Sequence, residues 1–260
     1  MIIVAAALDE LHARVAELRA DLTFVALAFQ LRPRIGAVVQ WQAAGDILAL
    51  LKQFMNEKSS RPEGIYGPLL VGLLAAFERY LRMLVRQCVE HWASRAATYD
   101  KLSEKLSRRN LILTGRLLAA IETLPDHLTV DIESVVANLA SCKRGSNSFC
   151  LNTQAFTATV TGMSPGVIER ALEFADVPDC WDIVGANTAL VKILGTKGAR
   201  ATGAEAQERL KELWRWRNHL AHGGDDEITI SETSLRDAID FVACFSGALD
   251  VAVGKVLSGS

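Results

Sequence analysis

The strongest constraint on the fold is a spacing of three and four residues between apolar side chains, which persists over long stretches of the chain. Between residues 8 and 30 this spacing puts six apolar side chains on one face: Leu8, Leu11, Val15, Leu18, Leu22 and Val25. A second stripe in residues 69–98 comprises Leu70, Leu73, Leu74, Phe77, Leu81, Leu84, Val85 and Cys88. Such spacing is typical of amphipathic helices that bury one face. Because alanine and leucine dominate and the chain has only 6 prolines, we predict an all-α fold, built as a helical bundle.

Proline and glycine positions divide this bundle into separate predicted helices. Pro33 should end the first helix, and a second helix should cover residues 35–56. Pro68 should begin the long helix over residues 69–98, and Ser164 should cap a later one. Loops are predicted over residues 58–67, 143–148 and 195–203, and the basic loop 143–148 is the best candidate for an internal boundary or insert. The remaining predicted helices cover residues 102–124, 128–142, 167–175, 181–194, 205–222 and 231–257.

The charge balance restricts how this chain can meet nucleic acid. Its formal net charge is −2, so no overall field attracts RNA, and any contact must come from a local basic patch. Two segments supply candidates, which are Arg209, Lys211, Arg215 and Arg217 in one and Lys105, Arg108 and Arg109 in the other. A solvated helix face is the alternative interpretation of both sets.

Cysteine usage and hydropathy bear on the compartment. The five cysteines are odd in number and widely spaced, with no Cys-x-x-Cys pair, so neither a disulfide framework nor a zinc site is indicated. We expect reduced thiols, no metal and no cofactor. The apolar start of the chain is followed at once by Asp9 and Glu10, and no uncharged run reaches the roughly 18 residues that a membrane span requires. We therefore expect a cytoplasmic protein without a membrane segment.

The segment from Trp214 to Gly224 gathers more potential chemistry than any other part of the chain. Arg217 is a permanent cation, Asn218 is a neutral amide, and His222 can move protons near neutral pH. A guanidinium holds a phosphate by paired hydrogen bonds, and an imidazole acts as a general acid or base. These three residues are therefore candidates for phosphodiester cleavage without a metal.

Their spacing limits how they can meet. On a helix Asn218 and His222 share a face, whereas Arg217 and His222 are five residues apart and do not meet. They converge if the helix ends at His222, or if a second copy of the chain brings its own motif across a two-fold axis. Gly223 and Gly224 favour a helix end, because glycine readily adopts the left-handed conformation that terminates helices. The alternative is a helix terminus without chemistry, since His-Gly-Gly is a common ending.

Three further residues are candidates for a supporting role. Glu78 lies within the long apolar helix, where a lone carboxylate invites a role. The alternative for Glu78 is an ion pair with Arg82, four residues along the same helix. Arg215 and His219 lie in the motif segment itself, and a partner within the fold is the simpler interpretation of His219.

The run Arg217-Asn218-His219-Leu220-Ala221-His222-Gly223 resembles the signature of the HEPN superfamily, Arg-Asn-x-x-x-His-Gly within a broader Arg-x4-6-His pattern. The size and the long N-terminal helical segment are most similar to the RiboL-PSP and MAE-type HEPN nucleases of bacterial defence loci. The resemblance implies a helical bundle of HEPN type, in which a last long helix, here residues 231–257, packs behind the motif. We expect a HEPN-like domain over residues 61–260, with additional N-terminal helices in residues 1–60 packed on it.

The resemblance also implies an activity. Many members are metal-independent endoribonucleases of toxin–antitoxin and antiviral systems, and they generally work as dimers. RNA would be the substrate, Arg217 would hold the phosphate, and His222 would accept or donate the proton. Asn218 would orient His222 or hydrogen-bond the phosphate. Glu78 would orient His222 or Arg217, because HEPN folds pack a helix of this kind against the motif helix. An antitoxin or another defence protein would be a partner. Gly224 stands where HEPN toxins paired with nucleotidyltransferases have a tyrosine that is modified by AMP, so that type of silencing is not expected.

Two non-catalytic alternatives remain open. The first is a helical module that binds RNA, a nucleotide or a partner protein. The second is an antitoxin or scaffold subunit that clasps another chain through residues 1–30.

Overall fold

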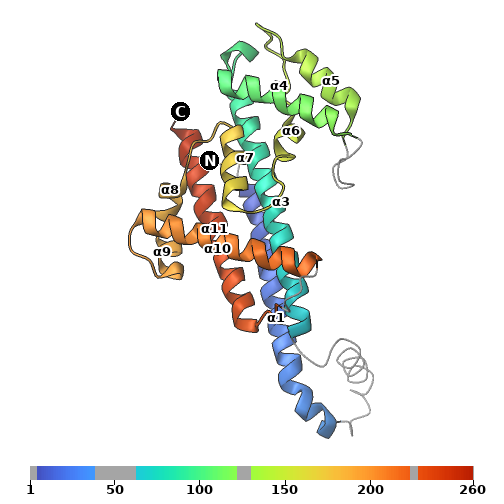
Figure 1. Ribbon diagram of the computed structural model, residues 1–260, viewed down its shortest axis with the longest axis vertical. Helices are drawn as coiled ribbons and strands as arrows, with labels where there is room; N and C mark the ends of the chain where they lie inside the picture. Colours follow the sequence, from blue (N-terminus) through green and yellow to red (C-terminus); the bar gives the residue numbers. More distant parts are fainter. Residues whose placement is uncertain (1–4, 39–62, 122–129, 223–227, 260) are drawn as a thin grey trace.

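Helices form every regular element of the described protein, as the apolar spacing predicts (Figure 1). The computed structural model describes residues 5–38, 63–121, 130–222 and 228–259. In chain order they form α1 (Ala5–Val38), α3 (Glu63–Arg95), the 3₁₀ turn η2 (Tyr99–Lys101), α4 (Glu104–Ala119), α5 (Ile132–Ser141), α6 (Thr153–Thr157), α7 (Pro165–Phe174), α8 (Trp181–Gly185), α9 (Thr188–Leu194), α10 (Ala199–His222) and α11 (Glu232–Ser258). The all-α prediction is confirmed.

The long helix α3 forms the centre of the molecule, with α1 and α11 packed along it (Figure 1). All eight side chains of its predicted apolar stripe are buried. Tyr80 reaches α11, where its hydroxyl donates a hydrogen bond to the carbonyl oxygen of Ser246 at 3.0 Å. Phe77 meets Phe245 edge to face, with ring centroids 5.9 Å apart. These contacts fix the rotation of α3 about its axis, and so decide which of its side chains face α10.

The first half of α1 belongs to the same core as α3 and α11. Five of its apolar side chains are buried there: Ala7, Leu11, Val15, Leu18 and Leu22. Ion pairs join its solvent-facing sides to both neighbours, from Arg19 to Asp240 at 2.6 Å and from Glu10 to Arg79 at 2.9 Å. The first half of α1 therefore packs on α3 and α11. A domain boundary near residue 60 stays a prediction, because residues 39–62 lie outside the described part of the chain.

Two helix boundaries predicted at prolines are wrong. The backbone of α1 continues past Pro33 to Val38, so the predicted break is absent, and the remainder of the helix expected over residues 35–56 lies outside the described residues. Helix α3 begins at Glu63, so Pro68 lies within the helix rather than at its start. A proline removes one backbone hydrogen bond and bends a helix, but it does not always end one. In α3 the burial of the apolar stripe outweighs that local cost.

The predicted helix over residues 181–194 is instead two short helices, α8 and α9. They are separated by Asn187, whose side-chain oxygen accepts hydrogen bonds from the backbone N–H groups of Ala189 and Leu190. Asparagine is a favoured helix N-cap because it satisfies such unpaired donors. The cap therefore restarts the helix inside a segment whose apolar spacing alone predicts a single one.

Two glycines let α8 lie directly against the first turns of α10. A Cβ atom at Gly185 would be 1.9 Å from the carbonyl oxygen of Ala199, and one at Gly203 would be 3.0 Å from that of Trp181. Helix α10 begins at Ala199, so the loop predicted over residues 195–203 is wrong for its second half, where Gly203 lies within the helix. Glycine here serves close helix packing instead of a turn.

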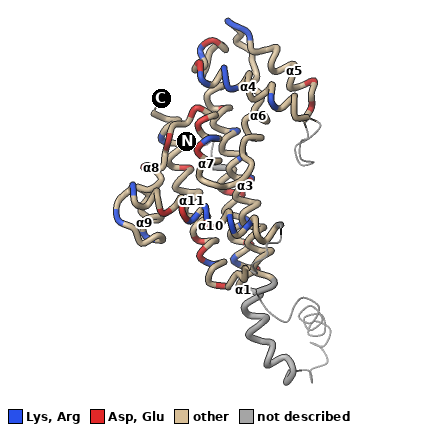
Figure 2. Tube along the Cα trace, viewed as in Figure 1, with Lys and Arg blue, Asp and Glu red and all other residues tan. Residues whose placement is uncertain are grey.

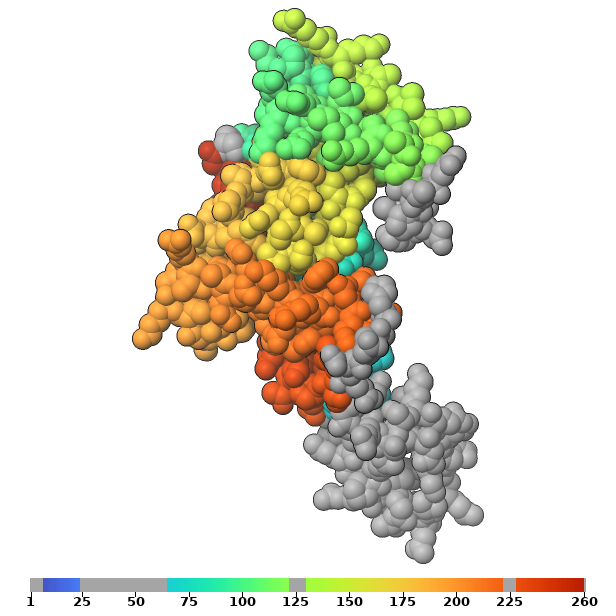
Figure 3. Space-filling model, viewed as in Figure 1, coloured from blue at the N-terminus to red at the C-terminus, as the bar shows by residue number. Residues whose placement is uncertain are grey.

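Helices α4 and α5, with the loop that follows α5, form one end of the molecule, called here the α4–α5 end (Figure 1). Buried Asn152 holds its parts together. Its side-chain amide donates to the carbonyl oxygen of Val135 at 3.0 Å and to the hydroxyl of Thr114 at 3.2 Å. Its backbone N–H donates to the side-chain oxygen of Asn110 at 3.0 Å. Figure 3 shows the segment of α6 and α7, in yellow, between this end and α10.

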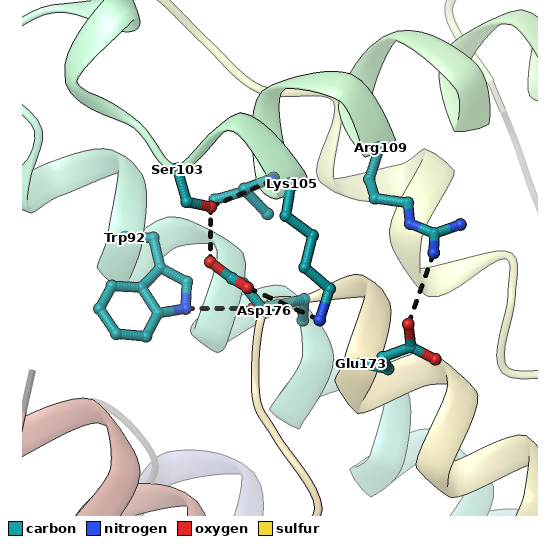
Figure 4. Close-up of polar contacts among 8 residues, drawn as sticks. Trp92, Ser103, Lys105, Arg109, Glu173 and Asp176 are labelled. Carbon is teal, nitrogen blue, oxygen red and sulfur yellow. Dashed lines mark hydrogen bonds and ion pairs between the residues drawn. The ribbon is translucent and has the colours of Figure 1, made fainter.

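Polar contacts also fix α4 to the end of α7 (Figure 4). Ser103, the N-cap of α4, donates a hydrogen bond to the carboxylate of Asp176 at 2.5 Å. Lys105 lies 3.9 Å from the same carboxylate, and Arg109 lies 3.5 Å from Glu173. The α4–α5 end is thereby anchored to the end of α7.

Helix α11 is capped as predicted, since the hydroxyl of Ser231 accepts the backbone N–H of Ser234 at 3.0 Å. By length and composition alone, Glu232–Ser258 is the one described helix apolar enough to cross a membrane. Half of its most apolar 18-residue window is buried inside the protein. Core helices of soluble proteins commonly have this composition, so the finding is weak evidence of a membrane span.

Candidate functional site

The motif lies in the last turns of α10, which crosses α3 near the beginning of the latter (Figure 1). Close packing holds the crossing in place: a Cβ atom at Gly67 would lie 3.2 Å from a methyl group of Leu220. The described helix ends at His222, while Gly223 and Gly224 lie outside the described residues, as does the side chain of His222.

Arg217 is held by residues on two helices. Its Nη1 donates a hydrogen bond to the side-chain oxygen of Asn218 at 3.2 Å. Its Nη2 lies 3.9 Å from Oε1 of Glu78, on α3. The Arg217 side chain keeps 34 % of its surface exposed, so part of the guanidinium faces solvent.

Glu78 is the buried member of this group, with a residue exposure of 7 %. Its second oxygen, Oε2, lies 3.6 Å from Nη2 of Arg82. Glu78 thus forms the ion pair with Arg82 that the spacing predicts, and it also lies near Arg217 on another helix. An ionised carboxylate is costly to bury alone, and two guanidinium groups on opposite sides offset that cost.

The two ion pairs of Glu78 are longer than ordinary hydrogen bonds, which span about 2.7–3.2 Å. The carboxylate therefore orients Arg82 and Arg217 electrostatically without occupying their N–H groups in short bonds. Those donors remain suited to a phosphate, which a guanidinium binds through two parallel hydrogen bonds. Helical spacing predicts Arg82 only as the alternative partner of Glu78, and the fold places it beside Arg217 as well.

The other motif residues have different surroundings. Arg215 is exposed, and His219 is half-buried and engaged within the fold. The basic set predicted on α10 is partly neutralised, because Arg209 pairs with Glu212 and Lys211 pairs with Glu208 at 2.6 Å. Arg209 also lies over the ring of Trp216, 5.4 Å from its centroid.

Metal ligands are not gathered in the described residues, where no group of three or more His, Cys, Asp or Glu side chains is placed to hold an ion. The chemistry that these residues can offer is that of a cationic site: two guanidinium groups on one buried carboxylate, beside an amide. Such a site binds and neutralises an oxyanion.

Comparison with known proteins identifies the family. The family model for RiboL-PSP-HEPN matches residues 43–252, which is most of the chain and includes α3, the motif helix and most of α11. A search of curated proteins finds no match, and neither does a search of solved structures. The match indicates an RNase-type or nucleotide-binding helical module. The chain belongs to the RiboL-PSP-HEPN family, as its motif and its fold lead one to expect.

Proposed function

We propose that this protein is a metal-independent endoribonuclease. The 2′-hydroxyl of the RNA attacks the adjacent phosphorus and displaces the 5′-oxygen of the next nucleotide. His222 accepts the hydroxyl proton or donates a proton to the leaving oxygen. Arg217 binds the scissile phosphate and offsets the charge that develops in the transition state. Asn218, hydrogen-bonded to Arg217, keeps the guanidinium in one orientation.

The observation that carries the proposal is the placement of Arg217 against buried Glu78. An arginine used only for solubility needs no buried carboxylate from another helix. Here Glu78 is 7 % exposed and lies between Arg217 and Arg82. A preorganised cation costs no reorganisation when the reaction occurs, which is the main source of electrostatic catalysis.

A pair of subunits completes the proposed site. Arg217 and His222 project about 140° apart around an ideal helix, so one motif does not easily place both on a single phosphate. A homodimer with two motifs facing a shared cleft removes this difficulty. The proposed setting is cytoplasmic, in bacterial defence or a toxin–antitoxin system, with an antitoxin or another defence protein as regulator.

The test is cleavage of a long single-stranded RNA by the purified protein in EDTA. We expect products with 2′,3′-cyclic phosphate ends and loss of cleavage in Arg217→Ala and His222→Ala, with helical circular dichroism unchanged. Arg236→Ala is the matched control, because Arg236 is an exposed helix arginine paired only with Glu232 in the described structure. Full activity in His222→Ala removes the proposed chemistry. RNA binding without any cleavage favours the alternative of a non-catalytic binding module.

A further inference from the structure

Exposed basic side chains gather at the α4–α5 end, away from the motif. Figure 2 marks the backbone positions of Lys and Arg in blue, some of them along α4 and others at the tip of the loop after α5. They come from the end of α3, from η2 and α4, and from that loop: Arg95, Lys101, Lys105, Arg108, Lys143 and Arg144. Asp100 and Glu104 are the acidic residues among them in sequence. The local excess of positive charge contrasts with a net charge of −2 for the chain.

The fold joins two basic segments that are about 40 residues apart in sequence. The backbone N–H of Gly145 donates to the carboxylate of Asp100 at 2.9 Å. The backbone N–H of Tyr99 donates to the carbonyl oxygen of Ser146, also at 2.9 Å. These bonds bring the loop with Lys143 and Arg144 beside η2, and they engage the Asp100 carboxylate with a backbone donor.

The basic residues of this surface differ in what they do for the fold. Lys105 and Arg109 pair with carboxylates at the end of α7 and anchor α4, as Figure 4 shows. Arg95, Lys101 and Arg108, in contrast, make no ion pair with any described residue, and neither do Lys143 and Arg144. Exposed, unpaired cations in one place are suited to a polyanion.

Two adjacent hollows give the surface its shape. One, of about 480 Å³, has Arg95, Lys101 and the carboxylate-bearing Asp176 in its lining. The other, of about 570 Å³, has Lys105, Arg108 and Arg109 with one acidic residue, Glu104. The nearby aromatic rings already have partners: the indole N–H of Trp92 donates to the carbonyl oxygen of Ala175 at 3.1 Å, and Tyr99 packs on Phe149. The surface therefore offers contacts to phosphates and not stacking platforms for bases.

We infer that the α4–α5 end binds the phosphate backbone of RNA outside the cleavage site, with little sequence preference. The choice of RNA as the polyanion rests on the proposed function. Arg95 lies on the same helix as Glu78, about 25 Å farther along at the usual helical rise. An RNA that touches both regions must be long, so this surface should lower KM for long strands and leave kcat and short substrates unaffected.

The test compares two triple variants with the same change in net charge. Lys101→Gln/Arg108→Gln/Arg144→Gln removes three unpaired cations of the surface. The control, Arg14→Gln/Arg86→Gln/Arg236→Gln, removes three exposed arginines that each pair within their own helix. The probe is a fluorescein-labelled 2′-O-methyl RNA of mixed sequence, read by anisotropy over a range of salt concentrations.

For the surface variant we expect binding at least tenfold weaker at about 0.1 M salt, and a salt slope smaller by about 2, since each phosphate contact to a single strand contributes about 0.7. The control should bind like the unmodified protein. Equal binding by both variants, equal weakening in both, or a protein that binds anionic phosphatidylglycerol vesicles but not the RNA would each overturn the inference. The probe lacks the attacking hydroxyl, so its binding is independent of cleavage. Cleavage assays on ordinary RNA therefore judge the proposed function separately.

Discussion

The contact between α8 and α10 gives the sharpest prediction of stability. In Gly185→Ala the new methyl group would lie 1.9 Å from the carbonyl oxygen of Ala199, and a Cβ atom essentially never comes within 3.0 Å of another heavy atom. The two helices must therefore separate by more than 1 Å. Overpacking of this kind costs about 1–3 kcal/mol, and a clash of a methyl group with a backbone carbonyl, which moves only with its helix, belongs at the upper limit. We expect a loss of about 3 kcal/mol in the free energy of unfolding, which lowers Tm by roughly 6–12 °C.

Two other glycine-to-alanine substitutions give reference values against which this loss of stability can be compared. Gly203→Ala brings a methyl group to 3.0 Å from the carbonyl oxygen of Trp181, so a smaller shift suffices and an intermediate loss is expected. Gly115→Ala, on the exposed face of α4, has nothing within 4 Å and should gain about 0.5–1 kcal/mol from helix propensity. Urea unfolding followed by circular dichroism measures all three. If Gly185→Ala is as stable as Gly115→Ala, the close approach of α8 and α10 is refuted.

Three further predictions concern charge and reactivity. Glu78→Gln should lower the kcat of RNA cleavage roughly tenfold to a hundredfold while the protein stays folded, because Arg217 loses the charge that orients it; an unchanged kcat contradicts this. Burial raises the pKa of Asp250, whose Oδ1 has no hydrogen-bond partner in the described structure. Ionisation above the unfolded pKa of about 3.9 therefore disfavours the folded state, so Asp250→Asn should unfold at higher urea at pH 7, with a gain that vanishes as pH falls below that value. Iodoacetamide should label exposed Cys150 in the folded protein, whereas Cys88, whose pKa burial raises to about 12, should be labelled only after unfolding, as mass spectrometry can verify.

Apolar spacing was enough to predict the helices, but it could not locate all of their ends. The stripe of α3 is buried as predicted, because periodicity reports directly which face a helix buries. The position of a helix end depends on local chemistry, and the same residue type can end a helix, begin a new one or lie within one. Gly203 belongs to a segment whose glycines predict a loop, but it lies within α10. There its missing side chain leaves room for the backbone carbonyl of Trp181. Asn187 lies inside a predicted helix but caps a new one.

The candidate site was predictable only where its residues lie on one helix, because spacing along the sequence then determines which side chains are neighbours. Spacing along one helix identified Arg82 as a neighbour of Glu78, since the two are four residues apart. The contact of Glu78 with Arg217 joins residues 139 positions apart, and it depends on how α10 crosses α3. That crossing is set by contacts such as Gly67 with Leu220, which no periodicity encodes.

The pairing of α1 with α11 has a consequence for the order of events during translation. Arg19 and Asp240 bond across 221 positions of sequence, and α3 has its buried face covered only when both outer helices are present. Domains are completed on the ribosome as their last elements emerge. A nascent chain that ends after α10 already contains Glu78 and Arg217, but Tyr80 still lacks its acceptor on α11. We therefore expect chains that end before α11 to lack the packing that fixes α3, so that the proposed site forms only after α11 has left the ribosome.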